Sequence, residues 1–153
     1  MRIRVGIFMV LLLALAGTLP SDAQMQMVSV EAEDIKWGVN PAIPGAKFGV
    51  VHGNPAQAGP FVVRVWFPAN HSVAAHRHPN AENVTVLWGT LYAGMADKLD
   101  RDKSKPYRAG GFFHMPADHA HFVWNKEETL IQVHGIGPTA FTYVDPADDP
   151  RKK

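Results

Sequence analysis

Apolar and polar residues alternate along several short stretches of this 153-residue chain. The clearest case is GPFVVRVWFPAN, residues 59–70, which lies between two turn-forming ends. Successive side chains of a β-strand point to opposite faces, so Val63, Val65 and Phe67 would share one face and Arg64 would lie on the other. This alternation predicts a strand.

Further β-type stretches are separated by Gly, Pro and Asn, and no long stretch has helical periodicity. We expect strands within residues 48–53, 59–70, 82–95 (hinged at Gly89), 110–125, 128–137 and 139–145. A charged loop is predicted at 97–106, and the charged tail 146–153 is expected to fray. Many short strands with regular turns are typical of an all-β sandwich or barrel, and the length suggests one domain.

The amino-terminal stretch has a different pattern. Two arginines precede an apolar run over residues 5–15, and small residues follow. This order is typical of a secretory signal peptide, so we expect residues 1–23 to be removed by cleavage after Ala23, with a second candidate site after Ala16. Residues 24–153 would then be exported to the periplasm. A membrane anchor is the alternative, but a bilayer span needs about 20 apolar residues.

Positive and negative charges balance in the expected mature chain. The whole chain has 15 Lys and Arg and 14 Asp and Glu; residues 1–23 hold two arginines and one aspartate, which leaves 13 of each. Nucleic acids and anionic membranes attract basic surfaces, so neither is expected as a partner of the mature chain. The chain has no cysteine, so any metal site must use nitrogen and oxygen ligands.

The stretch HRHPNAENVTVLWG, residues 76–89, combines residue types that bind metals. In an extended segment His76 and His78 point to the same side, because they are two residues apart. A following Pro-Asn turn would bring Glu82 back beside them. Imidazole and carboxylate groups suit divalent first-row metals. The alternative is that all three residues are solvated on a loop.

A second stretch, GGFFHMPADHAHFVWN, holds a further histidine after a Pro-containing turn. Together the two stretches resemble the two motifs of the cupin superfamily, in spacing as well as in identity. The first motif is matched by His76-x-His78, three residues, Glu82, six residues and Gly89; the second is matched by Gly110, five residues, Pro116-Ala117-Asp118, two residues, His121, three residues and Asn125. The resemblance covers residues 60–126 best.

Two positions depart from these motifs. Asn70 stands where the first motif opens on glycine, and Asp118 replaces the glycine of the P-x-G sequence. Both glycines serve turns in which φ can be positive, and Asn and Asp are the other residues that best tolerate this conformation. Neither position is a metal ligand in the family, so we expect both turns to be kept.

The resemblance implies a small jelly-roll barrel that holds a metal ion through His76, His78, Glu82 and His121. It also implies one or two coordination positions left open for water, oxygen or substrate, and a homodimer. The metal could be Mn, Fe, Ni, Cu or Zn, and the pattern does not distinguish among them.

Three further residues could act as catalytic groups beside the metal. His119 could share the face of His121, although a polar residue at the barrel mouth is the plainer interpretation. His134 alternates with apolar residues and could be an acid or base only if its face is interior, and the pattern leaves both faces open. Arg64 could hold a substrate carboxylate, although a strand arginine is more often solvated.

Three functions fit these observations. The first is a metal-dependent enzyme of oxygenase, decarboxylase or isomerase type that acts on a small molecule, as the resemblance implies. The second is a sensor or store that binds a metal or small ligand without turnover. The third is a metal-free barrel with a structural role, which the intact ligand set disfavours. An acid or base beside an open coordination position would favour the first over the second.

Overall fold

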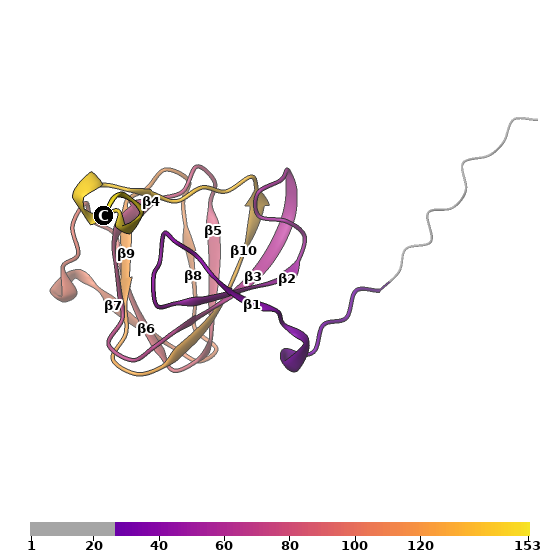
Figure 1. Cartoon of the computed structure of the whole chain (residues 1–153). Coiled ribbons are helices and arrows are strands. Elements are labelled where there is room, and N and C mark those ends of the chain that lie inside the picture. Colours follow the sequence, from indigo (N-terminus) through magenta and orange to yellow (C-terminus); the bar gives the residue numbers. More distant parts are fainter. Residues whose placement is uncertain (1–26) are drawn as a thin grey trace, which may run out of the picture.

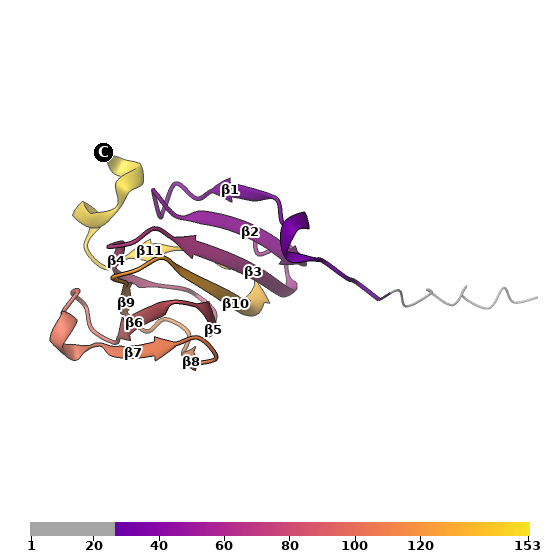
Figure 2. The same cartoon turned by 90° about the horizontal axis from the view of Figure 1, so that it is seen from below.

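Residues 27–153, which the computed structural model describes, form two antiparallel β-sheets that face each other (Figure 1). Seen from below, the strands of the two sheets curve around each other in a jelly roll (Figure 2). The expected signal peptide, residues 1–23, lies outside the described part. No helix among residues 27–153 is long and apolar enough to cross a membrane.

The strands divide six to five between the sheets within the described residues. The larger sheet has the order β1 (Trp37–Val39), β2 (Lys47–His52), β3 (Gly59–Phe67), β10 (Thr129–Gly137), β5 (Glu82–Trp88) and β8 (Phe112–Met115). The smaller sheet has the order β11 (Thr142–Tyr143), β4 (Ser72–Arg77), β9 (His121–Trp124), β6 (Thr90–Gly94) and β7 (Lys105–Arg108). The predicted all-β jelly roll is confirmed.

The inward faces of the large sheet form the core. Val63 and Val65 of β3 are buried, and the antiparallel register places Val133 and Ile131 of β10 beside them. Burial of such a side chain contributes about 1.5–3 kcal/mol relative to exposure. The alternation in the sequence therefore assigned the two faces of β3 correctly, because one face must meet the opposite sheet.

Three strands, β1, β4 and β7, lie outside the predicted strand ranges, and β4 occupies the stretch between two of them. β1 has only three residues and pairs with β2 at the edge of the large sheet. The charged loop expected at 97–106 contains a 3-10 turn, η2 (Arg101–Lys103), and its last two residues already belong to β7. β7 is mostly exposed and has little apolar alternation, so its pairing with β6 defines it.

The tail 146–153 is folded rather than frayed. It forms two 3-10 turns, η3 (Pro146–Asp148) and η4 (Pro150–Lys152). Asp145 accepts a hydrogen bond from the backbone NH of Ala147, and Asp149 accepts one from that of Arg151. Each turn therefore has an Asp cap followed by a proline, the combination that favours a helical start. A third short turn, η1 (Ala32–Asp34), precedes β1.

The two motif positions that depart from glycine lie in left-handed backbone. Asn70 and Asp118 each have a φ of 59°, and no other non-glycine residue in the described part has a positive φ. The expectation that Asn and Asp keep both turns is confirmed. Asn125, the last residue of the second motif, also holds the first turn, because its Oδ1 accepts a hydrogen bond from the backbone NH of His71.

Gly89 separates β5 from β6 as predicted, with a φ of 74°. A Cβ atom there would overlap the carbonyl oxygen of Glu128 and crowd Thr129. Gly110 has a similar φ of 85°, but a Cβ at that position would meet no atom within 4 Å. The two glycines therefore share backbone strain and differ in steric contact.

We predict that Gly110→Ala lowers the free energy of unfolding by about 1–2 kcal/mol, the usual cost of a left-handed alanine. Gly89→Ala should lower it by about 1–3 kcal/mol more, because overlap with packed atoms is added to the same strain. Urea unfolding of the two variants measures this difference. Equal losses would contradict the close contact at Gly89.

Candidate metal centre

Four side chains from three strands meet at one cavity. His76 belongs to β4 and His121 opens β9, and the register places these two residues directly opposite each other. His78 directly follows β4, and Glu82 is the first residue of β5. All four line the same cavity inside the barrel. Strand pairing therefore unites two motifs that are about twenty residues apart in the chain.

The three histidines form a close, buried group. One ring nitrogen from each of His76, His78 and His121 lies within 4.8 Å of the others. The ring centroids of His76 and His121 are 4.2 Å apart, and those of His76 and His78 are 5.0 Å apart. All three side chains are at most 8% exposed. This group could hold a metal ion.

Backbone carbonyls fix the orientation of each imidazole. Nδ1 of His76 donates to the carbonyl of Ala74 at 2.8 Å, and Nδ1 of His78 donates to that of Ala140 at 2.8 Å. Nδ1 of His121 donates to the carbonyl of His119 at 3.1 Å. A neutral imidazole that donates through Nδ1 keeps a lone pair on Nε2. The arrangement therefore supplies three Nε2 lone pairs, as metal-binding histidines do.

Burial favours the neutral form of His76 and His121. It lowers the pKa of His76 well below its usual value, and the neighbouring His121 and His78 lower it further. Burial also lowers the pKa of His121 to about 4, partly opposed by the hydrogen bond to the His119 carbonyl. Metal ions bind the neutral form of histidine, so the site needs little or no deprotonation of these two ligands near neutral pH.

The carboxylate of Glu82 lies beside the histidines. Its Oε1 is 3.3 Å from Nε2 of His78, and its Oε2 is 3.7 Å from Nε2 of His121. Burial raises the pKa of Glu82, and the adjacent His78 partly opposes this shift. When His78 is neutral and donates through Nδ1, its Nε2 lone pair faces the Glu82 carboxylate, so a proton or a metal ion between them would satisfy both acceptors. Three imidazoles with one carboxylate suit a divalent first-row metal.

The site opens on a cavity of about 430 Å³. This volume lies within the range of small-molecule sites, about 300–1,000 Å³. Most residues of its wall are apolar, and β3 contributes four of them, Phe61, Val63, Val65 and Phe67. The histidine cluster thus has an apolar, ligand-sized space next to it.

The three predicted auxiliary residues do not line this cavity. His134 lies on the outer face of the large sheet, because Ile131 and Val133 of the same strand occupy the inner face. Arg64 shares the outer face, where its Nε donates to Gln132 at 3.4 Å. His119 is exposed, and its Nδ1 bonds within its own turn. The structure therefore does not bring these residues to the metal cluster.

Sequence reasoning missed three contributors to the site. The ring of Phe141 stacks on His76 at 4.0 Å between centroids with an angle of 15°, and the carbonyl of Ala140 orients His78. Arg151 of η4 also lines the cavity. The short pairing of β11 with β4, which puts Tyr143 opposite His76, decides where this segment lies. No local pattern in the sequence predicts the pairing of β11 with β4.

A sequence model of the cupin family matches residues 54–145, which is more than half of the chain. The chain belongs to the cupin family. The matched span contains both histidine motifs, so the resemblance inferred from them is confirmed. No curated protein sequence matches this cupin.

Solved structures share the fold of this cupin at low sequence identity. The polyketide cyclase RemF from Streptomyces resistomycificus is 16% identical with a TM-score of 0.68, over 83% of this chain and 92% of that chain. A protein proposed to be an acetylacetone dioxygenase from Methylibium petroleiphilum PM1 is 19% identical with a TM-score of 0.63, over 84% and 88%. An oxalate oxidase is 25% identical with a TM-score of 0.57, over 82% and 68%.

We predict that the metal-free cupin loses stability as the pH falls through the range set by its buried histidines. Unfolded His121 takes up a proton near its usual pKa of 6.5, whereas folded His121 does so only near 4. The unfolded state therefore binds more protons between these values, and the free energy of unfolding falls with pH. For His121 alone, the full difference corresponds to about 3 kcal/mol.

Urea unfolding at about pH 7 and about pH 4, after chelation, tests this linkage. His121→Gln should lose about 3 kcal/mol less than the wild type over this interval. Glu82 acts in the opposite sense, because its raised pKa lets the folded state hold a proton that the unfolded state releases above its usual 4.5. Glu82 is present in both proteins, so comparing them isolates His121. The same pH dependence in both would show that His121 is not held neutral by the fold.

Proposed function

We propose that this cupin is a metal-dependent enzyme acting on a small organic molecule. His76, His78, His121 and Glu82 would hold one divalent first-row transition metal. The observation that carries the proposal is the convergence of three imidazoles, each oriented by a backbone carbonyl, on the wall of a ligand-sized cavity. Structural zinc sites usually contain cysteine, whereas this donor set suits an open site for reaction.

Each part of the site has a physical role in this proposal. A bound metal would supply Lewis acidity or redox chemistry toward an oxygen of the ligand. The carbonyls of Ala74 and Ala140 hold two imidazoles in place by accepting from Nδ1. The carboxyl of Glu82 can hold or release a proton at an oxygen, and burial raises its pKa. The apolar wall keeps bulk water from most of the ligand.

The structural neighbours support small-molecule chemistry without selecting a reaction. They include a polyketide cyclase, a proposed dioxygenase and an oxalate oxidase. At 16–25% identity these proteins share a fold that hosts several reactions. Oxygenase, decarboxylase and isomerase activities are therefore all within the proposal.

One observation favours a second candidate, a binding protein without turnover. Apart from the four metal-binding side chains, Arg151 is the one ionisable residue in the cavity lining among residues 27–153. If Glu82 stays bound to the metal throughout, the cavity has no carboxyl or imidazole left to move a proton. The protein would then bind a metal and a small molecule as a sensor or store.

The proposal also covers where the protein acts. The charged head, apolar run and small residues of the first 23 residues support export, with cleavage after Ala23 and a periplasmic location. The family resemblance supports a homodimer. The balanced charge of residues 24–153 supports a small-molecule ligand over nucleic acid or membrane lipid.

We predict about one equivalent of Mn, Fe, Ni, Cu or Zn in residues 24–153 purified without chelator and without a histidine tag. His121→Ala should weaken metal binding by more than about 100-fold, since even residues that only orient a ligand contribute 10–100-fold. Plasma mass spectrometry measures the metal content, and competition with a chelator measures the affinity. Iron or copper would direct assays to oxygen consumption, and manganese also to decarboxylation.

His119→Ala is the matched control. It removes an imidazole two residues away that is exposed and outside the cavity, and it keeps the backbone carbonyl that orients His121. This variant should retain full metal content. Stoichiometric metal in His121→Ala, or equal loss in both variants, would refute the assignment of the centre.

A further inference from the structure

Apart from the metal-binding side chains, the cavity wall is almost entirely apolar. β3 and β10 contribute branched side chains such as Val63 and Ile131. Within the described residues, the other polar side chains in the lining are Asn40, Thr139 and Arg151. A small hydrophilic molecule would leave this wall facing water, whereas an apolar body that covers it is favoured by the removal of apolar surface from water.

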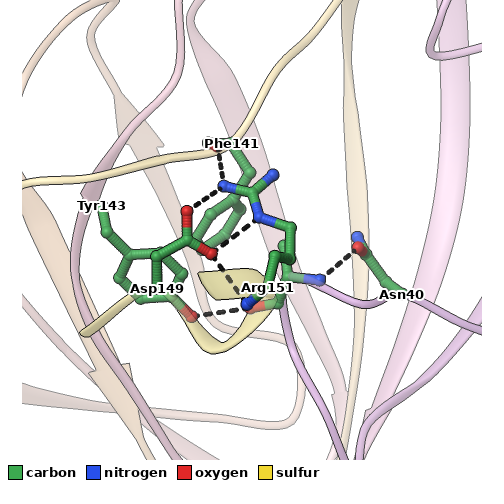
Figure 3. Close-up of polar contacts among 6 residues, drawn as sticks. Asn40, Phe141, Tyr143, Asp149 and Arg151 are labelled. Atoms are coloured by element: carbon green, nitrogen blue, oxygen red, sulfur yellow. Dashed lines mark hydrogen bonds and ion pairs between the residues drawn. The ribbon is translucent and has the colours of Figure 1, made fainter. Parts of the chain in front are cut away.

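Arg151 lies at the mouth of the cavity, since it lines the cavity and its side chain is still 39% exposed. Its guanidinium is held in place (Figure 3): Nε donates to Oδ1 of Asp149 at 2.7 Å, and Nη2 donates to Oδ2 at 2.8 Å and to the carbonyl of Phe141 at 3.0 Å. Nη1 points away from Asp149 and has no hydrogen-bond partner among residues 27–153. A guanidinium held in this way offers oriented donors to a ligand oxygen.

Asn40 and Ala42, which also line the cavity, are held by their own hydrogen bonds. The carbonyl of Ala42 accepts from the hydroxyl of Tyr143 at 2.6 Å, and the side-chain oxygen of Asn40 accepts from the backbone NH of Ala42 at 3.0 Å (Figure 3). Asn40 is thus engaged in holding its own loop. Arg151 is the charged hydrogen-bond donor that remains for a ligand at the mouth.

The cavity therefore combines three features: the histidine cluster with its carboxylate, an apolar wall, and the guanidinium of Arg151. We propose that the substrate is a largely apolar molecule that carries a carboxylate or other oxygen acceptor, which Arg151 hydrogen-bonds while the apolar body covers the wall beside the histidines. This inference rests on the proposed function, since it names the substrate class of the same site.

Three probes test the inference by binding rather than by turnover. 2-Naphthoate has an apolar body and a carboxylate, naphthalene has the body alone, and malonate has carboxylates without the body. We expect the purified cupin to bind 2-naphthoate more tightly than malonate in calorimetric and fluorescence titrations. Arg151→Gln should weaken 2-naphthoate binding by about tenfold or more and leave naphthalene within about twofold, since only the carboxylate loses a charged hydrogen bond.

Two further variants separate recognition from folding of the C-terminal turn. Arg77 is also paired with an aspartate and a backbone carbonyl, through Asp97 and Asp118, but it lies outside the cavity. Arg77→Gln should therefore leave all three affinities unchanged. Asp149→Asn loosens the same turn as Arg151→Gln but keeps the guanidinium, so it should keep the preference for 2-naphthoate over naphthalene.

Three results would overturn the inference: tighter binding of malonate than of 2-naphthoate, equal weakening of both aromatic probes in Arg151→Gln, or no binding of the aromatic probes. Repeating the titrations after chelation separates this inference from the proposed function. Stoichiometric metal without binding of aromatic probes would refute the proposed substrate class but not the metal-dependent enzyme. Arg151-dependent binding in a protein that takes up no metal would support the proposed ligand site and refute the metal-dependent enzyme.

Discussion

The antiparallel pairing of β4 with β9 is the constraint on which the site depends. It sets His76 opposite His121 and thereby joins two distant motifs. Side chains in a strand alternate between faces, so a slip of one residue would turn one of these imidazoles out of the barrel. The pairing itself is secured outside the cluster, because the side chain of Asn125 accepts from the backbone NH of His71 and donates to the carbonyl of Pro68. The second motif therefore holds the turn that opens the first.

Burying three imidazoles and a carboxylate in an apolar interior is costly unless each polar atom has a partner. Backbone carbonyls satisfy the Nδ1 atoms, and the same bonds leave the Nε2 atoms free. The Glu82 carboxylate then faces the Nε2 atom of His78. When both atoms are acceptors, only a proton or a metal ion between them can bridge the pair. The features that keep the polar cluster folded are thus the ones that prepare it for a cation.

The fold and the reaction are separate questions for this protein. Proteins as different as a polyketide cyclase and an oxalate oxidase share the barrel, so selectivity must come from the cavity wall and its mouth. Here the segment after β10 contributes to both. Phe141 stacks on His76, and its carbonyl accepts from Arg151, so one residue touches both the metal cluster and the mouth. Changes in this segment could alter which molecules fit without changing the histidines.

The sequence by itself determined the β class, the shared face of Val63, Val65 and Phe67, and the two turns at Asn70 and Asp118. The resemblance of its two motifs to those of cupins named the four converging residues. These predictions follow from local alternation, backbone preference or motif resemblance. Only the tertiary structure decided the rest. Alternation along β10 could not tell which face is interior, and pairing with β3 turned His134 outward. The pairing that brings Phe141 to His76, and the capped turn that brings Arg151 to the mouth, join residues far apart in the chain. Such contacts depend on how whole strands pack, which no short stretch of sequence specifies.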